Sequence, residues 1–135
     1  MPLDLKRVFL GTAAYTVVTF PIAVLWHVVL FEGLYQSFGY FQGEPSFLLG
    51  LLAILVQGAV MSVLYPLVRL AGSPVVRGLK FAILVGLFFW TSHVLAFLAK
   101  QAIAQAPLFL VMESGYLMVQ FGVFGVLIGL IYRTR

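Results

Sequence analysis

The chain contains no cysteine and has few charged residues. Without cysteine it has no disulfide framework, no thiolate metal site and no iron–sulfur cluster. A soluble domain normally has about a quarter of its residues charged, whereas this chain of 135 residues has eight basic and four acidic side chains. Hydrophobic residues make up 63% of it and the mean hydropathy is +1.12, which excludes a disordered chain. These shortages predict a protein whose surface faces a lipid bilayer.

Four long apolar runs fill most of the sequence. Each is long enough for a helix that rises 1.5 Å per residue to cross about 30 Å of hydrocarbon. Their only charged residue is Glu113, and they lack the alternation of a membrane β-strand. We therefore predict an all-α integral membrane protein, with one domain over residues 1–135 that is a bundle of four transmembrane helices. The expected spans are 8–31, 47–68, 81–99 and 108–132.

The basic residues lie mainly on one side of the expected spans. The two loops on the other side contain Lys100, Glu32 and Glu44. By the positive-inside rule, the basic side is cytoplasmic, which predicts a bacterial inner-membrane protein with both termini in the cytoplasm. The net charge of +4 then reports topology, and no nucleic-acid partner is expected. The basic residues on that side are Lys6, Arg7, Arg69, Arg77, Lys80, Arg133 and Arg135.

A weak internal repeat relates the two halves. Val56-Gln57 recurs 63 residues later as Val119-Gln120, and His27-Val28 recurs 66 residues later as His93-Val94. Two hairpins that both start inside would be parallel repeats about an axis along the membrane normal. The alternative is chance similarity between helices rich in Val, Leu and Gly.

Polar side chains inside the spans are the candidates for a ligand-binding site, because such residues are costly in a membrane. Five are proposed as ligand-binding residues: His93, His27, Gln57, Gln120 and Glu113. Counted from the nearest inner basic residue, three side chains form a deeper layer about 18–20 Å above the inner boundary: Gln57, His93 and Gln120. Three others form an outer layer about 30 Å up: His27, Lys100 and Glu113.

Each of these residues also has a purely structural interpretation. Glu113 and Lys100 have the same expected depth, so they are candidates for an interfacial salt bridge. The two glutamines are candidates for interhelical hydrogen bonds. His27 follows Trp26 and suits the aromatic belt at the interface. His93 is the hardest to explain structurally, because no carboxylate shares its expected layer.

The last span has a glycine face that suggests a partner. Small residues let helices approach closely in lipid, and this face is turned away from Glu113 and Gln120. We expect a homodimer or a larger membrane complex to form through it. Its residues are Gly115, Gly122, Gly125 and Gly129.

Three functions remain open. The first is binding or transport of a small solute or ion at the polar layers, and the second is an accessory or structural subunit of a membrane complex. The third is a redox subunit, in which His27 and His93 bind haem or combine with Glu113 as a two-histidine, one-carboxylate metal site. The expected depths of the two histidines differ by about 10 Å, which argues against one shared site. The cofactor and metal remain unknown, and an enzyme is not expected, because the sequence has no Ser-His-Asp set, carboxylate pair or phosphate loop.

Overall fold

The computed structural model describes residues 2–133, and every regular element in that range is helical. Two short π-helical segments and one 3-10 turn interrupt or extend the α-helices. The elements are α1 (Leu5–Val24), η1 (Leu25–Leu30), α2 (Glu32–Phe38), α3 (Phe47–Leu64), η2 (Tyr65–Leu67), α4 (Pro74–Trp90), η3 (Thr91–Leu95), α5 (Ala96–Lys100) and α6 (Ala106–Ile131).

Four continuous helical stretches are long and apolar enough to cross a membrane, as the sequence predicts. They cover Leu5–Leu30, Phe47–Leu67, Pro74–Lys100 and Ala106–Ile131. The third begins seven residues before its expected start, because Ser73 caps it by accepting from the backbone N–H of Val76 and Pro74 occupies its first turn. The loop expected over 32–46 contains a short helix, α2, at its beginning.

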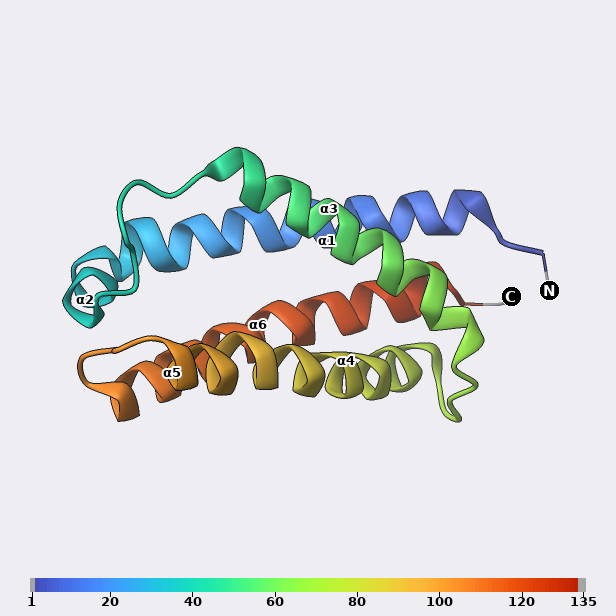
Figure 1. Cartoon of the computed structure of the whole chain (residues 1–135). Helices are drawn as coiled ribbons and strands as arrows, with labels where there is room; N and C mark the ends of the chain where they lie inside the picture. The colour runs from blue at the N-terminus through green and yellow to red at the C-terminus, as the bar shows by residue number, and fades with distance from the viewer. Residues whose placement is uncertain (1, 134–135) are drawn as a thin grey trace.

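The helices form two antiparallel hairpins that pack side by side. Helix α1 contacts both α3 and α6, and α6 contacts both α1 and α4, so α1 and α6 occupy the middle of the bundle. Figure 1 shows α1 and α3 as one pair and α4 and α6 as the other. The first turn of α1 and the last turn of α6 lie at the same end, while α2 and α5 lie at the opposite end.

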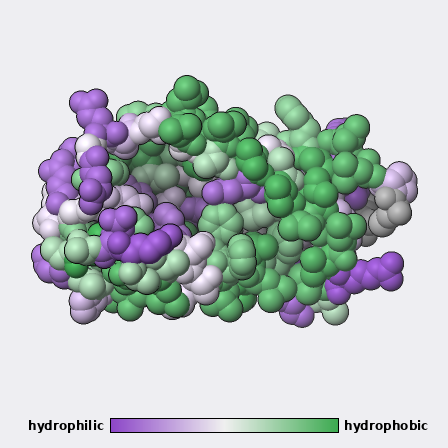
Figure 2. All heavy atoms as spheres, viewed as in Figure 1, coloured by the Kyte–Doolittle hydropathy of each residue, from purple (hydrophilic) through white to green (hydrophobic). Residues whose placement is uncertain are grey.

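The outer surface of the bundle is apolar along its length. Figure 2 shows hydrophobic residues over most of the bundle and hydrophilic residues gathered toward its ends. Large side chains point outward from every long helix, including Phe9, Leu48, Phe88 and Met118, each more than 70% exposed. Soluble monomers rarely expose apolar patches of this extent, so the surface suits a multi-pass membrane protein.

Glycine permits the closest helix approach, between α4 and α6. A Cβ atom at Gly78 would collide with the backbone of Gly125 and Gly129, and one at Gly129 would collide with Pro74. Two of the four glycines expected to contact another chain are therefore buried within this one. Gly122 has open space around it and Gly115 has only Trp26 nearby, so the expected interchain face is reduced to these two.

Candidate functional site

The side chain of Glu113 is the centre of a buried polar cluster. This carboxylate has no exposed surface and receives hydrogen bonds from three other elements. His27 Nε2 lies 2.9 and 3.1 Å from its two oxygens, and His93 Nε2 lies 2.8 Å from Oε1. The Tyr35 hydroxyl donates to Oε2 at 2.6 Å. The structure thus joins η1, η3, α2 and α6 at one carboxyl group, which we call the Glu113 cluster (Glu113, His27, His93 and Tyr35).

The hydrogen-bond partners of His27 show which of its atoms and those of Glu113 carry a proton. Nδ1 of His27 lies 2.9 Å from the carbonyl oxygen of Ala23, which only accepts, so Nδ1 carries a hydrogen. If Glu113 is ionised, Nε2 must also donate and His27 is an imidazolium. If Glu113 is protonated, Nε2 accepts and His27 is neutral. Both arrangements contain the same number of protons, so the two differ by transfer of one proton across 2.9 Å.

Tyr35 is fixed as a donor by its other partner. Its oxygen accepts a hydrogen bond from Trp26 Nε1 at 3.0 Å and its own hydrogen is directed to Glu113. Burial and the nearby negative charge of Glu113 raise the pKa of Tyr35 well above its usual value, so the phenol keeps its proton at physiological pH. It therefore stabilises the ionised carboxylate and takes no part in the proton count.

Both histidines lie on π-helical turns. His27 lies on η1, which ends where the N–H of Phe31 donates to the carbonyl oxygen of Trp26. His93 lies on η3, which ends where the N–H of Ala96 donates to the carbonyl oxygen of Thr91. Each end bond spans five residues, which widens the turn by one residue. Single π-turns inside α-helices occur frequently at functional sites. Here they rotate the two side chains toward α6 from opposite hairpins.

Aromatic rings surround His27 and separate it from the outside. Tyr40 stacks on the imidazole at a centroid distance of 5.5 Å with an interplanar angle of 16°. The rings of Tyr35 and Tyr116 pack edge-on against the imidazole, each at a centroid distance of 4.6 Å. His27 is 7% exposed, whereas the side chain of His93 is 35% exposed. His93 is therefore the more exposed of the two histidines that contact Glu113.

A second polar cluster lies nearer the basic end. The Tyr15 hydroxyl donates to Gln57 Oε1 at 3.0 Å and accepts from Gln120 Nε2 at 2.7 Å. Tyr15 and Gln120 are buried and Gln57 is half-buried. These three residues (Tyr15, Gln57 and Gln120) form the Tyr15 cluster. Its two amides are the glutamines related by the suspected repeat, just as the two imidazoles on Glu113 are.

One face of α1 connects the two clusters. Tyr15, Thr19, Ala23 and His27 follow at four-residue steps, so they lie one above another on the same side. Thr19 is 1% exposed, and its hydroxyl finds no hydrogen-bond partner among the described residues. Thr19 thus adds a buried polar group on the helix face between the two clusters.

The structure corrects the expected layering. His93 belongs with Glu113 and His27, and not with the two glutamines. Depth was counted from Lys80, but α4 begins six residues earlier, at Pro74. Measured along the helices, His93 is 19 residues from Pro74 and Glu113 is 18 from Ile131, which gives them nearly equal depth. The expectation that no carboxylate shares the layer of His93 is wrong.

The expected salt bridge between Glu113 and Lys100 is also absent. Lys100 ends α5 and is exposed, while Glu113 is enclosed by the two histidines and Tyr35. A lone lysine at the bundle end remains hydrated at little cost, whereas a buried carboxylate requires close donors. The interpretation of His27 as an interface residue fails for the same reason, because its ring is buried against Glu113.

The three residues of the supposed metal site do meet, although the depth count argued against it. Both imidazole Nε2 atoms bond the carboxylate directly, and the described residues contain no group of three His, Cys, Asp or Glu side chains placed to hold a metal ion. The Glu113 carboxyl group lies between the two Nε2 atoms, which are 2.9 and 2.8 Å from its Oε1, so it occupies the place that an iron bound to both imidazoles would need. The donor set therefore does not fit haem.

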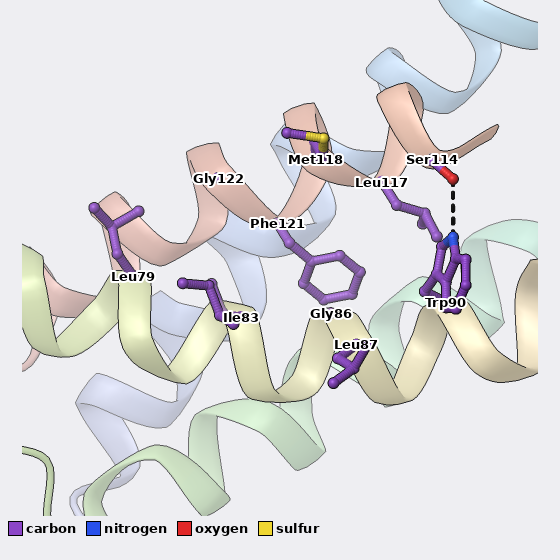
Figure 3. A pocket seen from close by; sticks show the side chains of 11 residues that line it. Leu79, Ile83, Gly86, Leu87, Trp90, Ser114, Leu117, Met118, Phe121 and Gly122 are labelled. Carbon is purple, nitrogen blue, oxygen red and sulfur yellow. Dashed lines mark hydrogen bonds between the residues drawn. The ribbon is translucent and has the colours of Figure 1, made fainter. Parts of the chain in front are cut away.

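An apolar cavity lies apart from both clusters. It has a volume of about 460 Å³ between α4 and α6, and Figure 3 shows its apolar lining, with the ring of Phe121 over Gly86. Its polar groups satisfy each other, because Trp90 Nε1 donates to the Ser114 hydroxyl at 2.9 Å. This groove opens on the apolar surface, and its lining is almost entirely apolar.

Sequence reasoning missed the two tyrosines that complete the clusters. Tyr15 could have been found, because it lies four residues before Thr19 and twelve before His27 on one helix face. Tyr35 gave no such signal. It belongs to a loop whose aromatic residues suggest headgroup contact, and only the return of α2 over the bundle end brings it to Glu113.

Comparison with family models, with curated proteins and with solved structures finds no match to this chain.

Proposed function

We propose that this chain is a small multi-pass membrane protein of the binding or transport class, and that the ion it binds and moves is the proton. The observation that carries the proposal is Glu113, a carboxylate without exposed surface inside an apolar helix, bonded to two imidazoles from different hairpins. Ionisable groups at such positions are expensive and typically mark ion or proton pathways.

The chemistry of the cluster favours a proton over a larger solute. The described residues leave no cavity between the carboxylate and its three donors, and the hydrogen bonds of 2.6–3.1 Å suit transfer of hydrogen ions. His93 provides an exposed terminus, and Thr19 followed by the Tyr15 cluster provides a polar continuation toward the basic end.

The groups that face Glu113 all participate in this proposal. They are His27 on η1, His93 on η3 and Tyr35 on α2, with the rings of Tyr40 and Tyr116 against His27. No lysine, arginine or second carboxylate forms an ion pair with Glu113 in the range 2–133. The charge of the site is therefore set by the carboxylate and the two imidazoles alone.

The membrane setting is part of the same proposal. The apolar surface supports insertion in a bilayer, and the basic residues at one end of the bundle support a cytoplasmic location for that end and for both chain termini. Arg135, one of those residues, lies outside the described part of the chain. The Glu113 cluster would then lie in the outer half of a bacterial inner membrane.

The proposal is tested by proton movement in proteoliposomes. Vesicles with a trapped pH dye receive a membrane potential from a potassium gradient and valinomycin. We expect the luminal pH of vesicles that contain the wild-type protein to change faster than that of empty vesicles, in the direction that the membrane potential drives protons. Glu113→Gln keeps the shape of the side chain but cannot ionise, so we expect the rate to fall to that of empty vesicles.

Two further variants make the result specific. Glu44→Gln removes a carboxylate from an exposed loop and should leave the rate unchanged. His93→Gln removes the more exposed imidazole of the Glu113 cluster. It should slow proton movement at least tenfold while the protein stays folded. A wild-type rate equal to that of empty vesicles, or a Glu113→Gln rate equal to wild type, contradicts the proposal and favours an accessory, structural role.

A further inference from the structure

A second cavity lies at the opposite, basic end of the bundle. It has a volume of about 250 Å³ and is formed where η2, the start of α1, the first turns of α4 and the end of α6 meet. Sites for drug-sized molecules typically measure about 300–1,000 Å³, so this one suits a compact group. It lies at the end of the molecule where α1 begins and α6 ends (Figure 1) and is separate from the Glu113 cluster.

Three arginines line this cavity, and no acidic residue does. They are Arg7, Arg69 and Arg77, contributed by three separate segments. Arg7 is partly neutralised by Asp4, at 3.3 Å, and its guanidinium lies 5.8 Å from the ring centroid of Tyr132. Positive residues at this end are expected from topology alone, so their number does not by itself define a site.

Two buried donors distinguish the cavity from a merely basic surface. Tyr65 is 6% exposed, and its hydroxyl has no hydrogen-bond partner among residues 2–133. The Nε atom of Arg77 is buried and has none either. Both side chains line the same cavity. An unsatisfied buried donor costs about 1–3 kcal/mol, so the two side chains give the wall of this cavity hydrogen-bonding capacity that no other described residue uses.

We propose that this cavity binds a phosphate group. Arginine matches the oxygens of phosphate through parallel N–H donors, and the Tyr65 hydroxyl would add one neutral donor. Basic pockets between membrane helices on the cytoplasmic side characteristically bind phospholipid headgroups. A lipid headgroup and a free phosphate present the same chemistry here, and the experiment distinguishes these two sources.

The test measures phosphate binding by the full-length protein. In detergent, inorganic phosphate and glycerol 3-phosphate are titrated by calorimetry. In nanodiscs, the thermal unfolding temperature is compared between pure phosphatidylcholine and a mixture with phosphatidylglycerol. Phosphate binding in detergent identifies a free phosphate as the ligand. A rise in unfolding temperature with phosphatidylglycerol alone identifies a lipid headgroup. Either result supports the site.

Variants locate the effect. Arg77→Gln should weaken phosphate binding, or reduce the lipid-dependent rise in unfolding temperature, about tenfold. Lys6→Gln makes the same change of charge on an exposed residue outside the cavity and should have little effect on either. Tyr65→Phe removes a buried hydroxyl without a partner, so it should weaken binding and raise the unfolding temperature of the unliganded protein. The proposal is overturned if neither phosphate nor phosphatidylglycerol affects the wild type, or if Lys6→Gln loses as much as Arg77→Gln.

Discussion

Glu113 is stable inside the bundle only because its neighbours compensate its charge. Transfer of an isolated carboxylate into a low-dielectric interior is so costly that it persists only when paired and hydrogen-bonded. The two imidazoles and the Tyr35 phenol occupy both carboxylate oxygens. At the scale of single residues, this predicts that removing a partner is more harmful than removing the whole charge.

His27 and His93 should differ in how much they stabilise the protein. His27→Ala leaves Glu113 buried without the imidazole that contacts both of its oxygens, and breaking a buried pair costs about 3–5 kcal/mol. His93→Ala should cost clearly less, because its ring is one-third exposed and its pair with Glu113 is therefore less buried. Unfolding free energies in mixed detergent, measured by circular dichroism, test this difference. Equal losses would contradict it, and Glu113→Gln combined with His27→Ala should restore part of the lost stability.

The identity of these residues was predictable from the sequence, but their grouping was not. Glu113 and both histidines stand out because ionisable residues are rare in apolar spans. Their convergence depends on where α4 begins and on the extra residue in each π-turn, and neither feature leaves a periodicity in the sequence. Because a charged residue such as Lys80 can lie inside a helix, counting depth from it misplaced His93.

At the scale of single elements, α2 covers the Glu113 cluster. Its residues Tyr35 and Phe38 point into the bundle and are fully buried. The carbonyl oxygen of Phe38 accepts a hydrogen bond from the N–H of Ala104 at 3.0 Å. Helix α2 is therefore hydrogen-bonded to both hairpins, through Trp26 of the first and Glu113 of the second. Composition alone could not reveal this, because a loop rich in aromatic residues suits the membrane surface equally well.

Tyr35→Phe tests how firmly α2 is held. The change removes a donor from Glu113 and leaves Trp26 Nε1 without its acceptor, so we expect a loss of about 1–3 kcal/mol of unfolding free energy. Tyr40→Phe is the matched control, since it also removes one phenol hydroxyl while the ring keeps its contacts with His27 and Phe109. A Tyr35→Phe protein as stable as the Tyr40→Phe protein would show that α2 is not fastened through this hydroxyl.

The packing of α4 on α6 depends on Gly78. Gly78→Ala would place a methyl group against the backbone of Gly125 and Gly129, and such overpacking typically costs about 1–3 kcal/mol. Gly122→Ala has open space and should be neutral or slightly stabilising. Thermal unfolding in detergent distinguishes the two, and a neutral Gly78→Ala would mean that the helices separate more easily than their close contact implies.

At the scale of the whole molecule, the two hairpins repeat their polar and close-packed positions. His27 and His93 share Glu113, and Gln57 and Gln120 share Tyr15. Gly11 packs against Ser62 as Gly78 packs against Gly125. These contacts favour an internal repeat over chance similarity. Four helices and the approximate spans followed from hydropathy, whereas the order α3, α1, α6, α4 across the bundle required the contacts themselves.

The orientation of the molecule can be tested with single cysteines, because the chain has none of its own. Ser73→Cys lies in the turn at the basic end and Glu44→Cys in the loop at the other end. By the positive-inside rule, a membrane-impermeant maleimide added to intact bacterial cells should label Glu44→Cys and leave Ser73→Cys unlabelled until the cells are opened. The reverse pattern would place the Glu113 cluster on the cytoplasmic side.

The most direct test of the proposed proton site is infrared spectroscopy of Glu113 in lipid bilayers during a pH titration. We predict that the wild type shows a protonated carboxyl band whose intensity changes with pH, that Glu44→Gln retains this band, and that Glu113→Gln lacks it. If the titration spectra of the wild type and Glu113→Gln superimpose, Glu113 does not exchange a proton, and the cluster serves only to hold the four helices together.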